Sequence, residues 1–194
     1  ISPTRFFIEE PVYDEFIKSF KSHVEAINVG DGLDSKSTMG PLVADRRLEV
    51  MEDFISDAIS SGGEVISGGG RGQSPGSFFE PTLIRDVPDT AKIMIEEPFG
   101  PVAPSASFSS IDEIIERANS LPFGLASYAF TSNPRTSQIL KSEIESGMLA
   151  INSMHIHSVE TPFGGLKHSG YGYEGSIEGL EAFLVTKYSS EIYT

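Results

Sequence analysis

Apolar side chains recur at helical spacing in two separate segments of the chain. The first segment predicts an amphipathic helix that starts after Pro11 and is broken at Gly30. Its apolar positions are Tyr13, Phe16, Ile17, Phe20, Val24 and Ile27. The second segment predicts a helix that stops at Gly62, where glycine is the usual C-terminal signal. Its apolar positions are Leu48, Met51, Phe54, Ile55, Ala58 and Ile59.

Short apolar runs between polar or glycine-rich segments predict strands over residues 4–8, 64–67, 78–84, 102–108, 125–130 and 148–151. Further helices are predicted after a capping box of Ser110 and Glu113, after Asn133, and over residues 176–182. From Val102 to Asn152 the order is therefore strand, helix, strand, helix, strand. This order predicts an α/β fold, namely a three-layer domain with a mainly parallel sheet and helices on both faces.

The end of the chain follows a different pattern. Residues 184–193 alternate enough between apolar and polar side chains to predict a terminal edge strand. An unpaired edge of this length needs a partner, so the strand is expected to pair with another domain or subunit. The predicted organisation is one domain over residues 1–183, followed by an arm over residues 184–194.

The composition excludes several classes of protein. The 194 residues carry a net charge of -14, which argues against binding to nucleic acid or to an anionic membrane surface. No apolar run is long enough to cross a membrane and no signal peptide is recognisable, so a cytoplasmic location is expected. The chain contains no cysteine, which excludes disulfides, zinc–thiolate sites and thiol catalysis by these residues.

The segment Glu96-Glu97-Pro98-Phe99-Gly100-Pro101 is the strongest candidate for a binding loop. Its prolines cannot donate backbone hydrogen bonds and push the preceding residues towards extended conformations, so a fixed loop is expected. The Glu97 carboxylate can accept hydrogen bonds from two sugar hydroxyls while the ring of Phe99 covers a heterocycle. The alternative interpretation is a surface carboxylate beside a phenylalanine of the core.

Three other motifs suggest different chemistry. Residues 170–175 match the Gly-x-Gly-x-x-Gly pattern of a dinucleotide-binding loop, but the preceding residues predict a loop where that motif needs a strand. His155 and His157 form a His-x-His pair that would need further ligands to bind zinc, and no metal site is predicted. Ser153 or Ser158 near His155 suggests a hydrolase, although no nucleophile-elbow motif surrounds either serine.

Four segments resemble, in order and spacing, the C-terminal half of the NAD(P)-dependent aldehyde dehydrogenase family. They are Glu96–Pro101, Asn119 with Phe123-Gly124-Leu125, Gly147–Asn152 and Pro162–Gly170. The resemblance covers nearly the whole chain, from Ile1 to Tyr188. The ending Glu174-Gly175-Ser176 is most similar to the succinate-semialdehyde dehydrogenase branch.

The resemblance implies a fold, a reaction and a set of binding residues. The family oxidises aldehydes to carboxylic acids with NAD or NADP, using a cysteine thiolate that attacks the carbonyl and a glutamate that activates water. Glu97 matches the family's ligand for the nicotinamide ribose, and Phe99 matches a ring that packs near the nicotinamide. The arm over residues 184–193 matches a segment for oligomer contacts, so a homo-oligomer is implied. Three residues are expected on the wall of the substrate tunnel: Asn152, His157 and Phe163.

The chain also departs from the family pattern. The nucleophilic cysteine, the general-base glutamate and the cofactor-binding domain of the family all match positions before Ile1. No catalytic residue is therefore assigned here, and the chain without its N-terminal cofactor-binding domain is expected to be inactive. Tyr173 stands where the family usually has arginine. His157 stands where the succinate-semialdehyde branch tends to carry a carboxylate-binding serine, so it either contacts a carboxylate or shapes a pocket for another aldehyde.

Two hypotheses about function therefore stay open. One is a part of an enzyme that oxidises an aldehyde, such as succinate semialdehyde, with NAD or NADP. The other is a non-catalytic binding or assembly domain with the same fold. A Gly-Gln-x-Cys sequence encoded upstream of Ile1 would favour the enzyme, and a start codon at that place would favour the binding domain.

Overall fold

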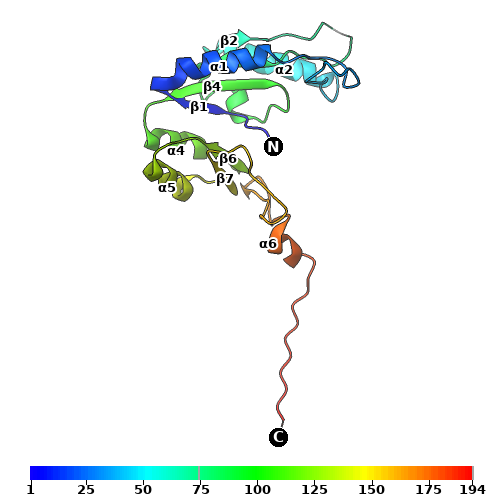
Figure 1. The fold of residues 1–194 in the computed structure, drawn as a ribbon, viewed down its shortest axis with the longest axis vertical. Helices are drawn as coiled ribbons and strands as arrows, with labels where there is room; N and C mark the ends of the chain where they lie inside the picture. The colour runs from blue at the N-terminus through cyan, green and yellow to red at the C-terminus, as the bar shows by residue number, and fades with distance from the viewer. Residues whose placement is uncertain (74, 194) are drawn as a thin grey trace. The chain divides into compact units, whose positions relative to one another are not determined.

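A computed structural model describes residues 1–73 and 75–193 of the chain (Figure 1). The contacts within it form two compact units, one over Ser2–Ile114 and one that starts at Ile115. Within the described residues, no helix is long and apolar enough to cross a membrane.

The first unit is built on a four-stranded sheet with the strand order β1-β4-β3-β2. β4 pairs with β1 and with β3 in parallel, whereas β3 and β2 are antiparallel. The sheet is thus mainly parallel, as predicted from the sequence. The strands are β1 (Phe6–Glu9), β2 (Glu64–Ser67), β3 (Thr82–Arg85) and β4 (Val102–Phe108).

Helices cover both faces of this sheet. Leu83 and Ile84 are consecutive in β3 and therefore point to opposite faces. Leu83 shares a buried cluster with α1 (Tyr13–Glu25), and Ile84 shares another with α2 (Arg46–Ser60). A short 3-10 helix, η1 (Glu10–Val12), joins β1 to α1, which runs alongside the strands in Figure 1. The predicted three-layer arrangement is confirmed.

The apolar periodicity correctly predicted the two long helices of this unit, α1 and α2. Leu48, Met51, Phe54, Ile55 and Ala58 of α2 are all buried, and α2 ends just before Gly62, which adopts φ 111°. The strand predicted over residues 78–84 is shorter than expected because Pro81 has no N–H for a ladder and residues 78–80 pair irregularly with residues 70–72. A short helix, α3 (Lys92–Ile95), precedes the loop that leads into β4.

The boundary between the units falls within α4 (Ile111–Asn119). The predicted capping box is present at its start, where the Ser110 hydroxyl accepts a hydrogen bond from the Glu113 amide at 3.2 Å. The Glu113 carboxylate reaches back to the amide of Ser109, one residue earlier than expected.

The second unit has two small sheets and two further helices. β6 and β7 are parallel, and β5 and β8 are antiparallel. Asn133 caps α5 as predicted, because its side chain accepts a hydrogen bond from the Arg135 amide at 2.9 Å. The elements are β5 (Phe123–Gly124), β6 (Ala126–Ala129), α5 (Pro134–Glu143), β7 (Met148–Ile151), β8 (Leu166–Lys167) and α6 (Ser176–Glu181).

Two details differ from the sequence prediction. The strands between Val102 and Asn152 do not form a single sheet, because β4 lies between β1 and β3 whereas β6 pairs with β7. The predicted strand over residues 184–193 is wrong for this chain by itself, since these residues follow α6 without helix or strand (Figure 1). A strand needs a hydrogen-bonding partner, so the pairing of this arm with another domain or subunit stays a prediction.

Candidate functional site

The loop over residues 96–101 connects α3 to β4 and presents two side chains to solvent. Glu97 is exposed, and the ring of Phe99 is 72% exposed. Pro98, between them, is buried. The alternative that Phe99 belongs to the core is therefore wrong. Phe99 also adopts φ 42°, a left-handed conformation that is unfavourable for a residue with a Cβ atom.

Contacts along the loop fix its backbone. The Arg47 guanidinium of α2 donates a hydrogen bond through Nη2 to the carbonyl oxygen of Pro98. Gly100 packs so closely on α2 that an added Cβ would lie 2.2 Å from the sulfur of Met51. The Pro101 carbonyl accepts a hydrogen bond from the Thr82 amide at 2.8 Å. The fixed loop that the prolines predict is therefore held mainly by α2.

The helix that leads into the loop is held by α2 as well. Asp57 accepts a hydrogen bond from the Lys92 amide at 2.7 Å, which satisfies a free N–H at the start of α3. The Lys92 ammonium lies 2.9 Å from an oxygen of Asp53, whose hydrogen bond and charge raise the pKa of Lys92. Ile93 and Met94 are buried in the core beside α2. These contacts fix the position of α3 and therefore the point at which the loop begins, at Glu96.

The exposed groups of this loop are chemically suited to contact a ribose and a flat ring. A carboxylate offers two acceptor oxygens, which suit two neighbouring sugar hydroxyls. An exposed aromatic ring on a fixed backbone can lie against a heterocycle at little entropic cost. Glu97 and Phe99 are separated by one buried residue and project from the same loop, so the structure brings together the two residues assigned to nucleotide binding.

His157 and Phe163 form a second pair, in the other unit. Their ring centroids are 5.7 Å apart and their planes are at 76°, an edge-to-face contact. Phe163 is held in place because its backbone N–H and carbonyl both bond to the backbone of Glu174 at 2.8 Å. The next residue, Gly164, is buried, and an added Cβ there would lie 2.5 Å from the ring of Tyr173. Tyr173 therefore supports the segment that carries Phe163.

The side chain of Asn152 forms two hydrogen bonds with the backbone of Thr131. Its carbonyl oxygen accepts a hydrogen bond from the Thr131 amide at 2.8 Å, and its amide nitrogen donates to the Thr131 carbonyl at 2.9 Å. Asn152 adopts φ 56°, which asparagine tolerates better than most residues. In this structure Asn152 therefore links the end of β7 to the second residue after β6.

The structure gives no support to the three alternative motifs. Within the described residues, no group of three or more His, Asp or Glu side chains is placed to hold a metal ion, so His155 and His157 lack further ligands. The Ser153 hydroxyl accepts a hydrogen bond from the His155 amide at 2.9 Å, and the Ser158 hydroxyl donates to Glu160 at 2.6 Å. Both serines therefore stabilise local turns.

The Gly-x-Gly-x-x-Gly segment is also not a phosphate loop. It is followed by α6, a helix of six residues, and preceded by the two-residue strand β8. The amide of Ser176 at the start of α6 bonds to the carbonyl of Val159 at 3.1 Å, and the amide of Glu174 bonds to Phe163. Two backbone donors of this segment and of the start of α6 are thus used within the chain.

The sequence analysis missed the residues that hold these segments in place. Arg47 and Met51 contact the Glu97 loop at Pro98 and Gly100. The only signal for them in the sequence was their spacing of four residues, which places them on the same face of one helix. In the second unit the Lys167 ammonium lies 2.6 Å from Glu145 and donates to the carbonyls of Asn119 and Leu121 at 2.9 and 3.1 Å. Lys167 therefore holds the segment of residues 162–170 against the end of α4 and the residues that follow it.

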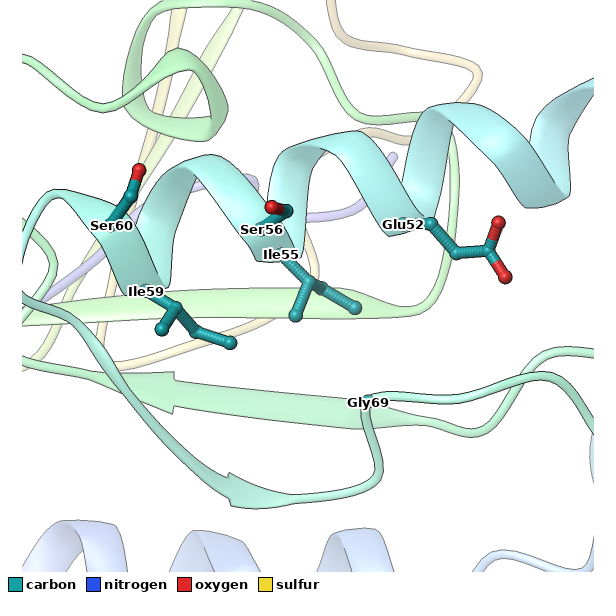
Figure 2. A pocket seen from close by; sticks show the side chains of 6 residues that line it. All are labelled: Glu52, Ile55, Ser56, Ile59, Ser60 and Gly69. Atoms are coloured by element: carbon teal, nitrogen blue, oxygen red, sulfur yellow. The ribbon is translucent and has the colours of Figure 1, made fainter.

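A hollow of about 380 Å³ lies along α2 beside the turn at Gly69. Figure 2 shows Ile55 and Ile59 on the helix side of this hollow, with Glu52 at one end. Both carboxylate oxygens of Glu52 accept hydrogen bonds from Arg71, at 2.7 and 2.8 Å, and this pairing lowers the pKa of Glu52. The acid in this hollow is thus already paired, and the hollow is a weaker candidate site than the Glu97 loop.

Comparison with known proteins gives consistent matches over nearly the whole chain. Residues 1–189 match the family model described as "Aldehyde dehydrogenase family". A 4-(hydroxymethyl)benzenesulfonate dehydrogenase of Comamonas testosteroni is 40% identical over 188 residues, which are 97% of this chain and 39% of that protein. The chain therefore spans about two-fifths of the length of the curated relatives it matches.

Solved structures give the same result. The succinate-semialdehyde dehydrogenase of Burkholderia pseudomallei is 37% identical with a TM-score of 0.92, over 94% of this chain and 38% of that one. The betaine aldehyde dehydrogenase of Staphylococcus aureus, solved with NAD+, is 32% identical with a TM-score of 0.88, over 95% of this chain and 37% of that one. These matches confirm the resemblance noted in the sequence, including its likeness to succinate-semialdehyde dehydrogenases.

Proposed function

Because the chain belongs to the aldehyde dehydrogenase family, we propose that it forms part of an enzyme that oxidises an aldehyde to a carboxylic acid with NAD or NADP. The reaction removes a hydride from the aldehyde carbon and adds an oxygen atom from water. The nicotinamide, when bound, supplies the hydride acceptor. The chain matches only part of its relatives, so this activity is proposed for the protein as a whole.

The observation that carries the proposal is the fixed loop with Glu97 and Phe99 exposed side by side. In this function the Glu97 carboxylate accepts hydrogen bonds from the ribose hydroxyls, and Phe99 limits the movement of the nicotinamide ring. Orientation of this kind lowers the entropic cost of bringing the aldehyde and the hydride acceptor together. The loop is therefore assigned to positioning of the nucleotide, without a role in bond breaking.

The chemical step needs groups from outside these residues. The 194 residues contain no cysteine, so the thiolate that the family resemblance implies must come from elsewhere in the protein. The same holds for the general-base glutamate and for the domain that binds the rest of the nucleotide. The chain by itself is therefore proposed to be inactive and to bind NAD or NADP weakly.

The substrate is proposed to be an aldehyde that also carries an acidic group. Two of the relatives have compounds with an acidic group in their names: an alcohol that carries a sulfonate, 4-(hydroxymethyl)benzenesulfonate, and an aldehyde that carries a carboxylate, the semialdehyde of succinate. The ring of His157 is exposed and can donate an N–H to a carboxylate or sulfonate oxygen, while Phe163 contributes an apolar surface. His157 and Phe163 are therefore the proposed substrate contacts, and Asn152 is proposed only as support for the end of β7.

We also propose that the protein is a cytoplasmic homo-oligomer that uses the arm over residues 184–193. The support is the apolar surface of this arm: Leu184, Val185, Tyr188, Ile192 and Tyr193 are each at least 64% exposed. An exposed surface of this kind is favourable only when it is covered by another chain or domain.

The test of the proposed function is a turnover assay of the full-length protein. NAD+ or NADP+ is supplied with succinate semialdehyde, with 4-sulfobenzaldehyde or with the neutral aldehyde butanal, and nicotinamide reduction is followed by absorbance. We expect reduction with the two acidic aldehydes at a kcat/KM about tenfold or more above that for butanal, as one charge-assisted hydrogen bond provides. A protein that reduces no nucleotide with any aldehyde would contradict the proposal and favour the non-catalytic binding domain.

A further inference from the structure

We propose that Arg47 is a positioning residue for the nucleotide loop and that it acts on the loop backbone. This inference rests on the proposed function of Glu97 and Phe99. Arg47 lies in the first turn of α2, and its guanidinium donates to the carbonyl of Pro98, which stands between the two nucleotide-binding residues. Neither the family resemblance nor the loop motif pointed to this arginine.

The position of the accepting carbonyl explains why this hydrogen bond matters. The Pro98 carbonyl and the Phe99 amide belong to the same rigid peptide plane. Rotation of that plane changes φ of Phe99, which is held at the unfavourable value of 42°. By holding the Pro98 carbonyl, Arg47 stabilises the conformation of Phe99 and with it the direction of its exposed ring.

The surroundings of Arg47 indicate that its side chain is committed to this contact. Its Nε atom is buried, and no hydrogen-bond partner for it lies among the residues that the structure describes. Four residues further along α2, Met51 is fully buried and packs against Gly100 of the same loop. Arg47 and Met51 thus support the two sides of Phe99, at Pro98 and at Gly100. Arg46, by contrast, is exposed.

Arg46 provides a matched control on the same helix turn. We would compare Arg47→Met with Arg46→Met in the full-length protein, because each removes one guanidinium and keeps a long side chain. Arg47→Lys is the third variant; it keeps the charge, but its ammonium is one atom shorter in reach and donates from a single point. The melting temperature of each variant shows whether it is folded.

The first readout is hydrogen exchange of the loop peptide without any nucleotide. We expect Arg47→Met to raise exchange of the Val102 amide, which donates to the Gly100 carbonyl at 2.9 Å, by about tenfold, the value of one hydrogen bond from a charged donor. Arg46→Met should leave this exchange unchanged, and Arg47→Lys should fall between the two. Equal exchange in the Arg47→Met and Arg46→Met proteins would overturn the proposed role of Arg47.

The second readout is steady-state kinetics. We expect Arg47→Met to raise KM for NAD or NADP by about tenfold with little change in KM for the aldehyde, since only the nucleotide loop is affected. Faster exchange together with an unchanged nucleotide KM would overturn the nucleotide function proposed for Glu97 and Phe99, while the contact of Arg47 with the loop would stand. The two failures are therefore distinguishable.

Discussion

The ring of His157 lies edge-on to the ring of Phe163, with the ring centroids 5.7 Å apart. This contact orients the imidazole from one side, because Phe163 is itself fixed to the backbone of Glu174 by two hydrogen bonds. Among residues 1–73 and 75–193, no hydrogen bond to the His157 ring is formed. An oriented imidazole with free ring nitrogens is suited to bind an acidic group of a substrate.

Replacement of His157 by phenylalanine tests this role. His157→Phe keeps an aromatic ring against Phe163 but removes the N–H donor. In the full-length protein we expect KM for succinate semialdehyde to rise about tenfold, the value of one hydrogen bond to a charged group, with no change for butanal. His155→Phe is the matched control. An equal effect on both aldehydes would show that the ring only shapes the pocket.

The hydrogen bonds between Asn152 and Thr131 predict a structural role for this asparagine. Asn152→Gly should lower the free energy of unfolding by about 1–2 kcal/mol, because two hydrogen bonds are lost while glycine tolerates the positive φ. Asn152→Ala should be less stable still, since alanine must also adopt φ 56°. Urea denaturation measures both values. A glycine variant of normal stability with a raised KM for the aldehyde would instead restore the substrate-binding role.

The close packing of Gly100 on Met51 predicts that the loop accepts no side chain at this position. Gly100→Ala should destabilise the protein by roughly 1–3 kcal/mol, because an added Cβ would lie 2.2 Å from the Met51 sulfur. Gly32→Ala is the matched control, since an added Cβ there meets no atom within 4 Å. The two variants are compared by urea denaturation. Equal midpoints would show that the loop moves freely away from α2.

Tyr13 predicts a change in stability at alkaline pH. Its hydroxyl accepts a hydrogen bond from the Asp86 amide at 2.9 Å and lies 3.3 Å from the Ser105 hydroxyl, and burial raises its pKa above the ordinary 10.0. A raised pKa means that the folded state favours the neutral form of the hydroxyl. The contribution of Tyr13 to the free energy of unfolding is therefore complete below pH 10.0, and it is lost as the pH rises through the higher pKa of the folded state.

Tyr13→Phe should lower the free energy of unfolding by about 1–3 kcal/mol at neutral pH, because the Asp86 amide loses its acceptor. Above pH 10.0 the difference in free energy of unfolding between the variant and the unmodified protein should become smaller, because only the unmodified protein loses stability there. Urea denaturation at both pH values measures it, with the exposed Tyr188→Phe as control. A difference that is constant with pH would mean that the Tyr13 hydroxyl does not ionise in this range.

The apolar periodicity was sufficient to predict the two long helices and the layers of the first unit, but not the short helices η1 and α3. Leu48, Met51 and Phe54 mark the buried face of α2 at the spacing of a helix, and the strand over Val102–Phe108 has the predicted bounds. Pairing between strands was harder, because the order of elements does not reveal that β4 lies between β1 and β3. That pairing depends on contacts between residues far apart in the chain.

The site could be predicted only in part for a similar reason. The proline-rich motif predicted a fixed loop, since proline restricts the backbone locally, and the assignment of Glu97 and Phe99 to the nucleotide stays a prediction. The positive φ of Phe99 and the contact of Arg47 with Pro98 depend on how α2 packs, and 51 residues separate the two partners. Asn152 was expected on the wall of the substrate tunnel, and its hydrogen bonds to Thr131 were not predicted because Thr131 carries no motif.

The most direct test of the account is the kinetics of Glu97→Gln in the full-length protein, with the exposed neighbour Glu96→Gln as control. Loss of the carboxylate should loosen the ribose and slow hydride transfer about ten- to a hundredfold, with a larger kinetic isotope effect from a deuterated aldehyde. The melting temperature should stay the same, because Glu97 is exposed. An unchanged rate of hydride transfer, or a large fall in melting temperature, would contradict the assignment of Glu97 to the nicotinamide ribose.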